Sequence, residues 1–214
     1  MTRHKTAITI LALLLYSVFF AIAWIDDLAK YYGMDVLFFA LFILFLHATF
    51  AFWKLTIPVY ALVVLSLAAH LMGIFGWYNA SPLPIQWDHI THGVPLFTFT
   101  VFLFNFVRPW MDRFWSAKTW SVLLLVLLSG LGIGAIVENV EFAGFLALGY
   151  GEGGLFLGGP GDGLPVTSAQ ADLIQELGGG YINTELDLVW NGFGVLAAVV
   201  LMSIIQFGFK KRAL

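Results

Sequence analysis

The sequence predicts an all-α fold, a polytopic membrane helical bundle with six transmembrane helices and both termini cytoplasmic. Of the 214 residues, 60% are hydrophobic and only 11% are charged, and the mean hydropathy is +0.90. Soluble domains contain about 25% charged residues, so this chain has too few to cover a surface that faces water. Its apolar runs are also long enough to cross a bilayer, which takes about 20 residues each.

The apolar runs are expected to form the transmembrane helices of a single integral membrane domain, residues 1–214. The predicted spans are 7–25, 35–53, 57–76, 89–107, 120–148 and 186–208. They do not show the alternation over about ten residues that is typical of membrane β-strands. The fifth run is longer than one crossing needs, so it is expected to tilt or to begin as an interfacial segment at Trp120. The first run, which ends near Ala21-Ile22-Ala23, also resembles a signal peptide, but its length favours a retained helix.

Composition excludes several function classes. Ten Lys and Arg residues against thirteen Asp and Glu residues leave no basic surface for nucleic acid. The chain has no cysteine, so it is not a disulfide scaffold. Its glycines do not form a phosphate-binding loop, and Gly130 and Gly134 in the fifth run form a G-x-x-x-G pattern typical of close helix packing.

The distribution of charge predicts the orientation. With both termini cytoplasmic, nine of the ten basic residues lie on the cytoplasmic side: Arg3, Lys5, Lys54, Arg108, Arg113, Lys118, Lys210, Lys211 and Arg212. This is the positive-inside pattern, and it favours a cell membrane location, the cytoplasmic or inner membrane. Ten of the thirteen acidic residues then lie outside or at the outer boundary, while Glu138 and Glu141 lie within the fifth span.

The longest predicted loop, 149–185, is extracytoplasmic and rich in glycine. Thr167-Ser168-Ala169-Gln170 is interpreted as a capping box for a short helix over 168–177. Three glycines, Gly178 to Gly180, are expected to end that helix. Long loops of this kind are often lids or binding loops.

Ionisable side chains at membrane depth are costly, and they mark function by default. Asp88 and His92 are spaced i, i+4, Glu138 and Glu141 are spaced i, i+3, and Asp187 is followed by Asn191 at i+4, so each pair shares a helix face. By their depth in the predicted spans, these groups and a histidine of the third span share the outer half of the membrane. One site is therefore expected to contain His70, Asp88, His92, Glu138, Glu141 and Asp187.

Four carboxylates and two imidazoles have the composition of a divalent-metal site. Carboxylates favour Mg²⁺, Ca²⁺ or Mn²⁺, and histidine admits Zn²⁺ or iron, so the sequence does not distinguish Zn, Mg, Mn and Fe. All six residues are predicted metal ligands, and Glu138, Glu141 and His92 are also predicted to be catalytic. A metal there would activate water or polarise a phosphoryl or carbonyl oxygen.

Structural interpretations stay open for single members of this set. His70 alone would fit a hydrogen bond between helices, and Asp88 and Asp187 alone would suit helix N-termini. Pro95 leaves the carbonyl of Thr91 without its helical donor, so this carbonyl is free to line a cavity. Five further residues are interpreted as structural or as parts of a solvated loop: His47, His89, Asp26, Asp27 and Asp35.

Short motifs resemble those of the YjdF-like small inner-membrane proteins and, more loosely, of the VanZ-like proteins. In chain order they are Ala69-His70-Leu71, Trp87-Asp88-His89-Ile90-Thr91-His92-Gly93, Glu138-Asn139-Val140-Glu141-Phe142, Phe156-Leu157-Gly158 with Gly161-Asp162, and Asn183-Thr184-Glu185-Leu186-Asp187. Two departures stand out: Asn183 replaces an acid, and 163–182 is an insertion. The family is largely uncharacterised, so the resemblance implies a shared polar site and no particular reaction.

Two function classes remain open, and the sequence does not decide whether the protein is an enzyme. One is a membrane enzyme with an outer-leaflet histidine and carboxylate site that acts on a lipid or envelope substrate. The other is a non-catalytic protein that binds a lipid-like or glycopeptide ligand, or a structural polar network. Ion conduction is disfavoured because few polar residues continue into the inner half of the bundle. Membrane lipid is the expected partner, nucleic acid is not, and the oligomeric state is not indicated.

Overall fold

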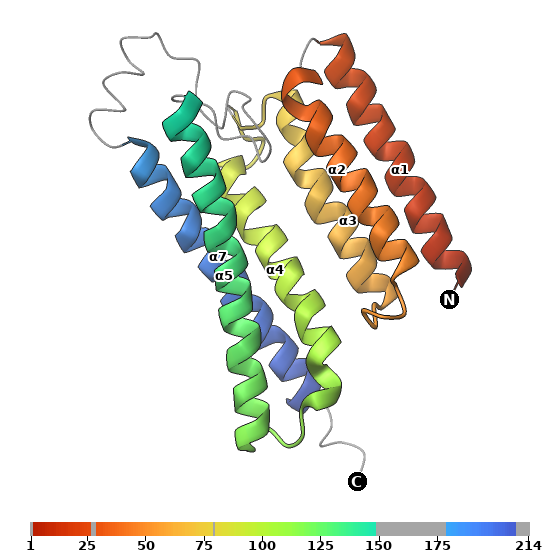
Figure 1. The fold of residues 1–214 in the computed structure, drawn as a ribbon, viewed down its shortest axis with the longest axis vertical. Helices are drawn as coiled ribbons and strands as arrows, with labels where there is room; N and C mark the ends of the chain where they lie inside the picture. The colour runs from red at the N-terminus through yellow and green to blue at the C-terminus, as the bar shows by residue number, and fades with distance from the viewer. Residues whose placement is uncertain (1, 27–28, 79, 149–178, 209–214) are drawn as a thin grey trace.

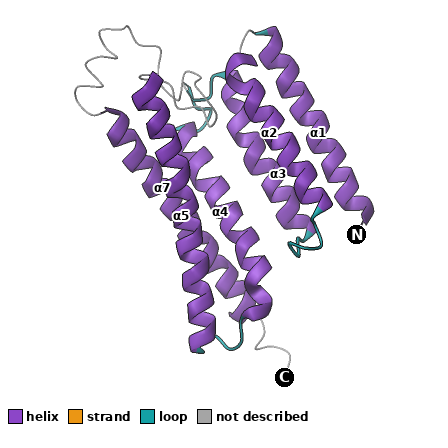
Figure 2. Ribbon diagram, viewed as in Figure 1, coloured by secondary structure: helices purple, strands orange, loops and turns teal. Residues whose placement is uncertain are grey.

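The computed structural model describes residues 2–26, 29–78, 80–148 and 179–208. These residues form helices and no strand, which confirms the predicted all-α class (Figure 2). The main helices are α1 (Thr2–Ile25), α2 (Ala29–Ala48), α3 (Ile57–Leu71), α4 (Trp87–Val107), α5 (Ala117–Leu148) and α7 (Gly179–Ser203). Short 3-10 turns extend α3 over Met72–Phe75 and α4 over Arg108–Trp110, and a π turn extends α7 over Ile204–Gly208.

The helices form two groups of three (Figure 1). In one group α1, α2 and α3 lie side by side, and in the other α4 packs against both α5 and α7. Contacts between α3 and α4 join the two groups. Successive helices alternate in direction, so α3 and α5 end, and α4 and α7 begin, at the upper end in Figure 1. We call this the site end.

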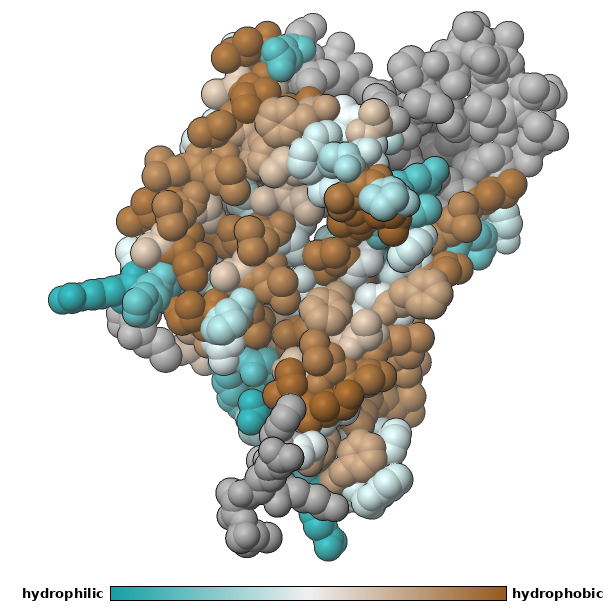
Figure 3. All heavy atoms as spheres, turned by 180° about the vertical axis from the view of Figure 1, so that it is seen from behind, coloured by the Kyte–Doolittle hydropathy of each residue, from teal (hydrophilic) through white to brown (hydrophobic). Residues whose placement is uncertain are grey.

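Five of these helical segments are long and apolar enough to cross a membrane, and the apolar part of α2, Tyr32–Ala48, is shorter. Hydrophobic side chains cover much of the face in Figure 3. Large apolar side chains such as Leu11 and Leu128 are exposed along the helices. That exposure suits a lipid environment, because lipid tails solvate apolar side chains without a hydrophobic penalty. The protein is a helical membrane bundle.

Two predicted boundaries need correction. The second span was expected over 35–53, but α2 begins at Ala29 and ends at Ala48, and the chain then turns through Lys54, whose φ is 51°. The loop was expected to continue to 185, but α7 already begins at Gly179; the candidate membrane span within it, Thr184–Gly208, agrees with the expected 186–208. Gly179 and Gly180 thus belong to the first turn of this helix, where each costs about 1 kcal/mol relative to alanine. The predicted short helix over 168–177 lies outside the described residues.

Glycines bring α4, α5 and α7 close together. A Cβ atom built on Gly194 of α7 would lie 2.1 Å from the carbonyl oxygen of Gly93 in α4. A Cβ on Gly130 would lie 2.7 Å from Oγ1 of Thr100, and one on Gly134 would lie 3.2 Å from Cβ of Asn191. The predicted G-x-x-x-G surface is therefore a packing surface, and it holds the polar residues of the three helices within reach of one another.

Candidate metal centre

A buried histidine lies at the centre of the polar cluster. His92 is in the second turn of α4, and its side chain is only 10% exposed. Its Nε2 atom lies 3.1 Å from Oδ1 of Asp88, one turn earlier on the same helix, as the i, i+4 spacing predicted. Its Nδ1 atom lies 2.9 Å from Oε1 of Glu138 on α5. Both ring nitrogens thus face carboxylates.

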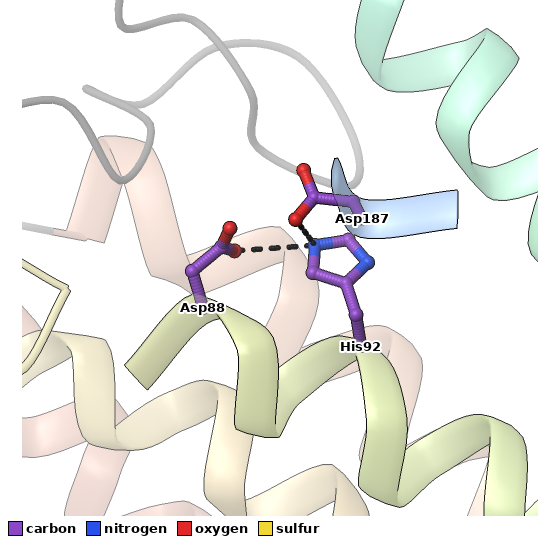
Figure 4. A group of neighbouring side chains, drawn as sticks. All are labelled: Asp88, His92 and Asp187. Atoms are coloured by element: carbon purple, nitrogen blue, oxygen red, sulfur yellow. Dashed lines mark ion pairs between the residues drawn. The ribbon is translucent and has the colours of Figure 1, made fainter. Parts of the chain in front are cut away.

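Two further carboxylates approach the Nε2 side of the ring. Oε2 of Glu141 on α5 and Oδ1 of Asp187 on α7 each lie 3.9 Å from Nε2 of His92. Asp187 is in the third turn of α7, and Figure 4 shows its carboxylate and that of Asp88 pointing toward the same nitrogen. Oxygens from three helices therefore surround one edge of the imidazole.

On the Nδ1 side, an amide holds Glu138. Asn191, one turn after Asp187 on α7, donates from Nδ2 to Oε1 of Glu138 at 2.6 Å. The same oxygen therefore accepts from the amide and faces the imidazole. Among the described residues, the other oxygen, Oε2, is buried and has no hydrogen-bond partner. An unsatisfied buried carboxylate oxygen is costly, so it indicates that a polar ligand belongs beside it.

The cluster carries an excess of negative charge. A protonated His92 would supply one positive charge against as many as four carboxylates, and Asp88, Glu138 and Asp187 are buried. Like charges taken out of water repel strongly, and a divalent cation between them would offset that repulsion.

The ligand atoms are also close enough to hold such a cation. Two triplets have ligand atoms within 4.8 Å of one another: Asp88, His92 and Asp187, and His92, Glu138 and Glu141. The residues present fit a divalent metal with mostly oxygen ligands.

The comparison with known families agrees with the membrane-protein fold. Residues 7–207 match the model of a family described as predicted membrane protein (DUF2238). The chain belongs to this family. The match confirms the resemblance to the YjdF-like proteins, which are DUF2238 members. No curated protein and no solved structure matches the chain.

In this DUF2238 protein, the structure brings five of the six expected site residues together and places the sixth, His70, elsewhere. Nε2 of His70 lies 3.0 Å from Oδ2 of Asp35 on α2, and Nδ1 lies 2.8 Å from the hydroxyl of Tyr78. Both of its ring nitrogens are therefore occupied by groups outside the His92 cluster. The contact to Asp35 is the hydrogen bond between helices that the sequence left open as an alternative for His70.

Asp35 is the clearest correction among the acidic residues. It was expected in a solvated loop, but it is 2% exposed and lies in the second turn of α2. The early start of α2 is the reason, since it places Asp35 inside the bundle opposite α3. Tyr78 was not predicted at all, because a single tyrosine in a connecting segment carries no spacing signal. Asp35 did carry a signal, since the apolar residues Met34 and Val36 flank it directly.

The two histidines interpreted as structural have contacts that suit that role. Nδ1 of His47 lies 2.6 Å from Oγ1 of Thr9, near the end of α2 that is remote from the site end. The ring of His89 stacks on that of Trp190, with centroids 4.8 Å apart.

Proposed function

We propose that this protein is a membrane-embedded, divalent-metal-dependent hydrolase that acts on an ester of a membrane lipid or a lipid-like envelope precursor. The observation that carries the proposal is the convergence of four carboxylates, from α4, α5 and α7, on one buried imidazole. A purely structural histidine needs only one or two partners, so this excess of carboxylate supports a cation site.

The proposed ligands surround Nε2 of His92. Asp88, Glu141 and Asp187 would supply oxygens, and their separations of 3.1 to 3.9 Å from Nε2 are close to those of ligands that share one ion. Ligands about 2.1 Å from an ion are about 3 Å apart at right angles. We therefore propose Asp88, Asp187 and His92, whose ligand atoms lie within 4.8 Å of one another, as the inner ligands, with Glu141 as a fourth and without His70.

Glu138 would have a different role from the ligand role expected from the sequence. Its Oε1 atom faces Nδ1 of His92, and Asn191 holds that oxygen in place. Histidines that bind a metal usually donate their other ring N–H to a carboxylate, which fixes the ring tautomer and leaves the free nitrogen for the ion. Glu138 would orient His92 in this way, with Nε2 presented to the metal.

A metal held there would lower the pKa of a bound water and polarise a phosphoryl or carbonyl oxygen of the substrate. The oxygen-rich ligand set favours Mg²⁺ or Mn²⁺, and the imidazole admits Zn²⁺ or iron. Because the exterior of the bundle is hydrophobic, lipid substrates would reach the site by lateral diffusion within the membrane.

We also propose that the site end faces the outer leaflet. Supporting this orientation, Lys5, Lys54 and Lys118 all lie toward the opposite end of the bundle, near the start of α1 and the α2–α3 and α4–α5 connections. The chain has no cysteine, so single cysteines introduced at Asp26 and at Lys118 would report sidedness against no background. Impermeant maleimide added to intact cells should label the cysteine at position 26 and not the one at 118. The reverse result would invert the orientation.

Hydrolysis is tested with full-length protein in nanodiscs and defined lipids. Fluorescent phosphatidic acid, phosphatidylglycerol and diacylglycerol represent a phosphomonoester, a phosphodiester and a carboxylic ester. With Mn²⁺ or Zn²⁺ present, wild type should release product from at least one of them. Asp187→Asn should not, whereas the exposed-site control Asp112→Asn should match wild type. Saturable binding of a lipid without turnover would refute hydrolysis and support the non-catalytic alternative.

A further inference from the structure

A second hydrogen-bonded group lies beside the metal centre. Asp35 of α2, His70 of α3 and Tyr78 of the segment after α3 form a chain of two contacts, of 3.0 and 2.8 Å. The Asp35 side chain is 3% exposed, and the rings of Phe39 and Tyr32 pack edge-on against the imidazole. Asp35 is buried, His70 and Tyr78 are half-buried, and the group links three separate segments of the chain.

The direction of the hydrogen bonds follows from the chemistry of the partners. A carboxylate only accepts, so Nε2 of His70 donates to Asp35. In a neutral imidazole Nδ1 is then an acceptor, and the hydroxyl of Tyr78 donates to it. Burial raises the pKa of Tyr78 well above its ordinary value, so the phenol carries the proton that this donation needs. The order is Tyr78 to His70 to Asp35.

Tyr78 also reaches the metal centre. The ring of the preceding residue, Trp77, packs edge-on against that of Trp87, the residue before Asp88, with centroids 4.5 Å apart. The carboxylates of Asp88 and Glu141 are close enough to the phenol to act on it electrostatically. The phenol thus stands between His70 on one side and the His92 cluster on the other.

The fold makes room for the phenol at this place. A Cβ atom on Gly73 would lie 2.4 Å from two ring carbons of Tyr78 and 2.6 Å from the hydroxyl of Tyr32, so a larger residue there would displace the tyrosine rings. Gly76 then ends the 3-10 turn with a φ of 74°, a left-handed conformation that turns the chain toward Tyr78. Two glycines therefore determine where the tyrosine stands.

We propose that Tyr78, His70 and Asp35 form a proton relay that serves the metal centre. In the forward step a water molecule in the site loses a proton to the oxygen of Tyr78, and the hydroxyl proton of Tyr78 passes to Nδ1 of His70. The hydroxide forms a bond to phosphorus or to the ester carbon, and the bond to the leaving oxygen breaks with its electron pair. The imidazolium returns its proton through Tyr78 to that leaving oxygen, which restores the chain.

The relay would supply the general base that the proposed metal ligands do not provide. Carboxylates bound to a cation are weak bases, whereas His70 is outside the proposed ligand set and its ring is oriented by Asp35. A base that is oriented by a carboxylate is the arrangement used in triads of nucleophile, histidine and acid. Tyr78 would be the group that touches water or substrate, while His70 and Asp35 act through it. This inference rests on the proposed function.

The relay is tested with the fluorescent lipid ester that wild type hydrolyses best, after metal content has been measured on every variant. A positioned general base contributes about 10²- to 10⁴-fold. Tyr78→Phe and His70→Gln should therefore keep the metal and lose at least about 100-fold in kcat, with KM nearly unchanged. Tyr16→Phe is the matched control, because it also removes a buried phenol hydroxyl, which donates to the carbonyl of Val64 far from the site. It should leave kcat unchanged.

The outcomes separate the two proposals. If the Tyr78 and His70 variants hold metal and turn over lipid at the wild-type rate, the relay is refuted and the hydrolase proposal stands. If wild type itself does not turn over any ester, the hydrolase proposal fails and the relay fails with it. A second readout needs no substrate: ¹⁵N NMR of labelled histidines should show His70 protonated at Nε2 and accepting at Nδ1. A proton on Nδ1 alone, or a metal-bound Nδ1 or Nε2 after Zn²⁺ is added, would overturn the relay.

Discussion

The close contact between α4 and α7 makes Gly194 the most sensitive packing position beside the His92 cluster. In Gly194→Ala the new Cβ would lie 2.1 Å from the carbonyl oxygen of Gly93, 3.0 Å from its carbonyl carbon and 3.0 Å from the backbone nitrogen of Phe97. All three atoms belong to the backbone, so no side-chain rotation can relieve the overlap. The two helices must separate, locally by about 1 Å, before the contact becomes acceptable.

The cost of that separation can be estimated. Overpacking costs about 1–3 kcal/mol, and a backbone clash belongs at the upper end of this range. Alanine regains about 1 kcal/mol of helix propensity relative to glycine, which leaves a net loss of about 2 kcal/mol. For a chain of this size that corresponds to a decrease in Tm of roughly 4–8 °C. Because α4 carries His92 and α7 carries Asp187, metal affinity should fall as well.

The assay is thermal unfolding in detergent or nanodiscs, with Gly132→Ala as the matched control. A Cβ on Gly132 meets nothing within 4 Å, so this variant should be neutral or up to about 1 kcal/mol more stable. Equal Tm values for the two alanine variants would refute the close packing of α4 on α7, and so would an increase for Gly194→Ala.

Three further predictions concern single residues. His92→Gln removes the partner of two buried carboxylates, so in metal-free protein it should cost about 3–5 kcal/mol in denaturant unfolding. The control Lys118→Gln breaks only the exposed ion pair with Asp112, so its free energy of unfolding should stay within about 1 kcal/mol of wild type. Equal losses for His92→Gln and Lys118→Gln would contradict the burial of the His92 cluster. Gly76→Ala forces a side chain into a φ of 74° and should cost about 1–2 kcal/mol by thermal unfolding, whereas no loss would argue against the left-handed turn. Burial raises the pKa of Tyr78 above 10.0, so the contribution of the protonated phenol to stability is complete below pH 10 and is lost as pH rises toward the folded-state pKa. The free energy of unfolding of Tyr78→Phe should therefore fall less steeply above pH 10 than that of wild type. An equally steep fall in both proteins would show that the phenol is solvated.

Residues paired at helical spacing were predictable from the sequence. Asp88 with His92, and Glu138 with Glu141, each share a helix face because the backbone repeats every 3.6 residues. The position of each pair along its apolar run then predicted that both pairs lie at the same depth in the membrane. In the structure the three carboxylates of these pairs do lie around the imidazole of His92. The role of Glu138 relative to His92 could not be derived, because it depends on which ring nitrogen each carboxylate reaches.

The partners of His70 were not predictable for a related reason. Depth alone put His70 in the same layer as His92, but depth does not say which way a side chain points around its helix. In the structure it faces α2 and contacts Asp35, which was expected in a solvated loop but lies in a helix that begins six residues before the predicted span 35–53. From the sequence alone, an acidic residue at the predicted end of a helix is interpreted as a loop residue, and only the true helix boundary shows that it is buried.

The central claim is that the His92 cluster binds a divalent cation, and metal content tests it most directly. Purified full-length protein is exposed in turn to Mg²⁺, Mn²⁺, Zn²⁺ and Fe²⁺, desalted, and measured by mass spectrometry of the elements. Wild type and the control Asp112→Asn should retain about one equivalent of at least one metal, and Asp187→Asn, which keeps the size of the side chain, should retain almost none. Folded wild type that retains no metal, or Asp187→Asn that retains a full equivalent, would contradict the account.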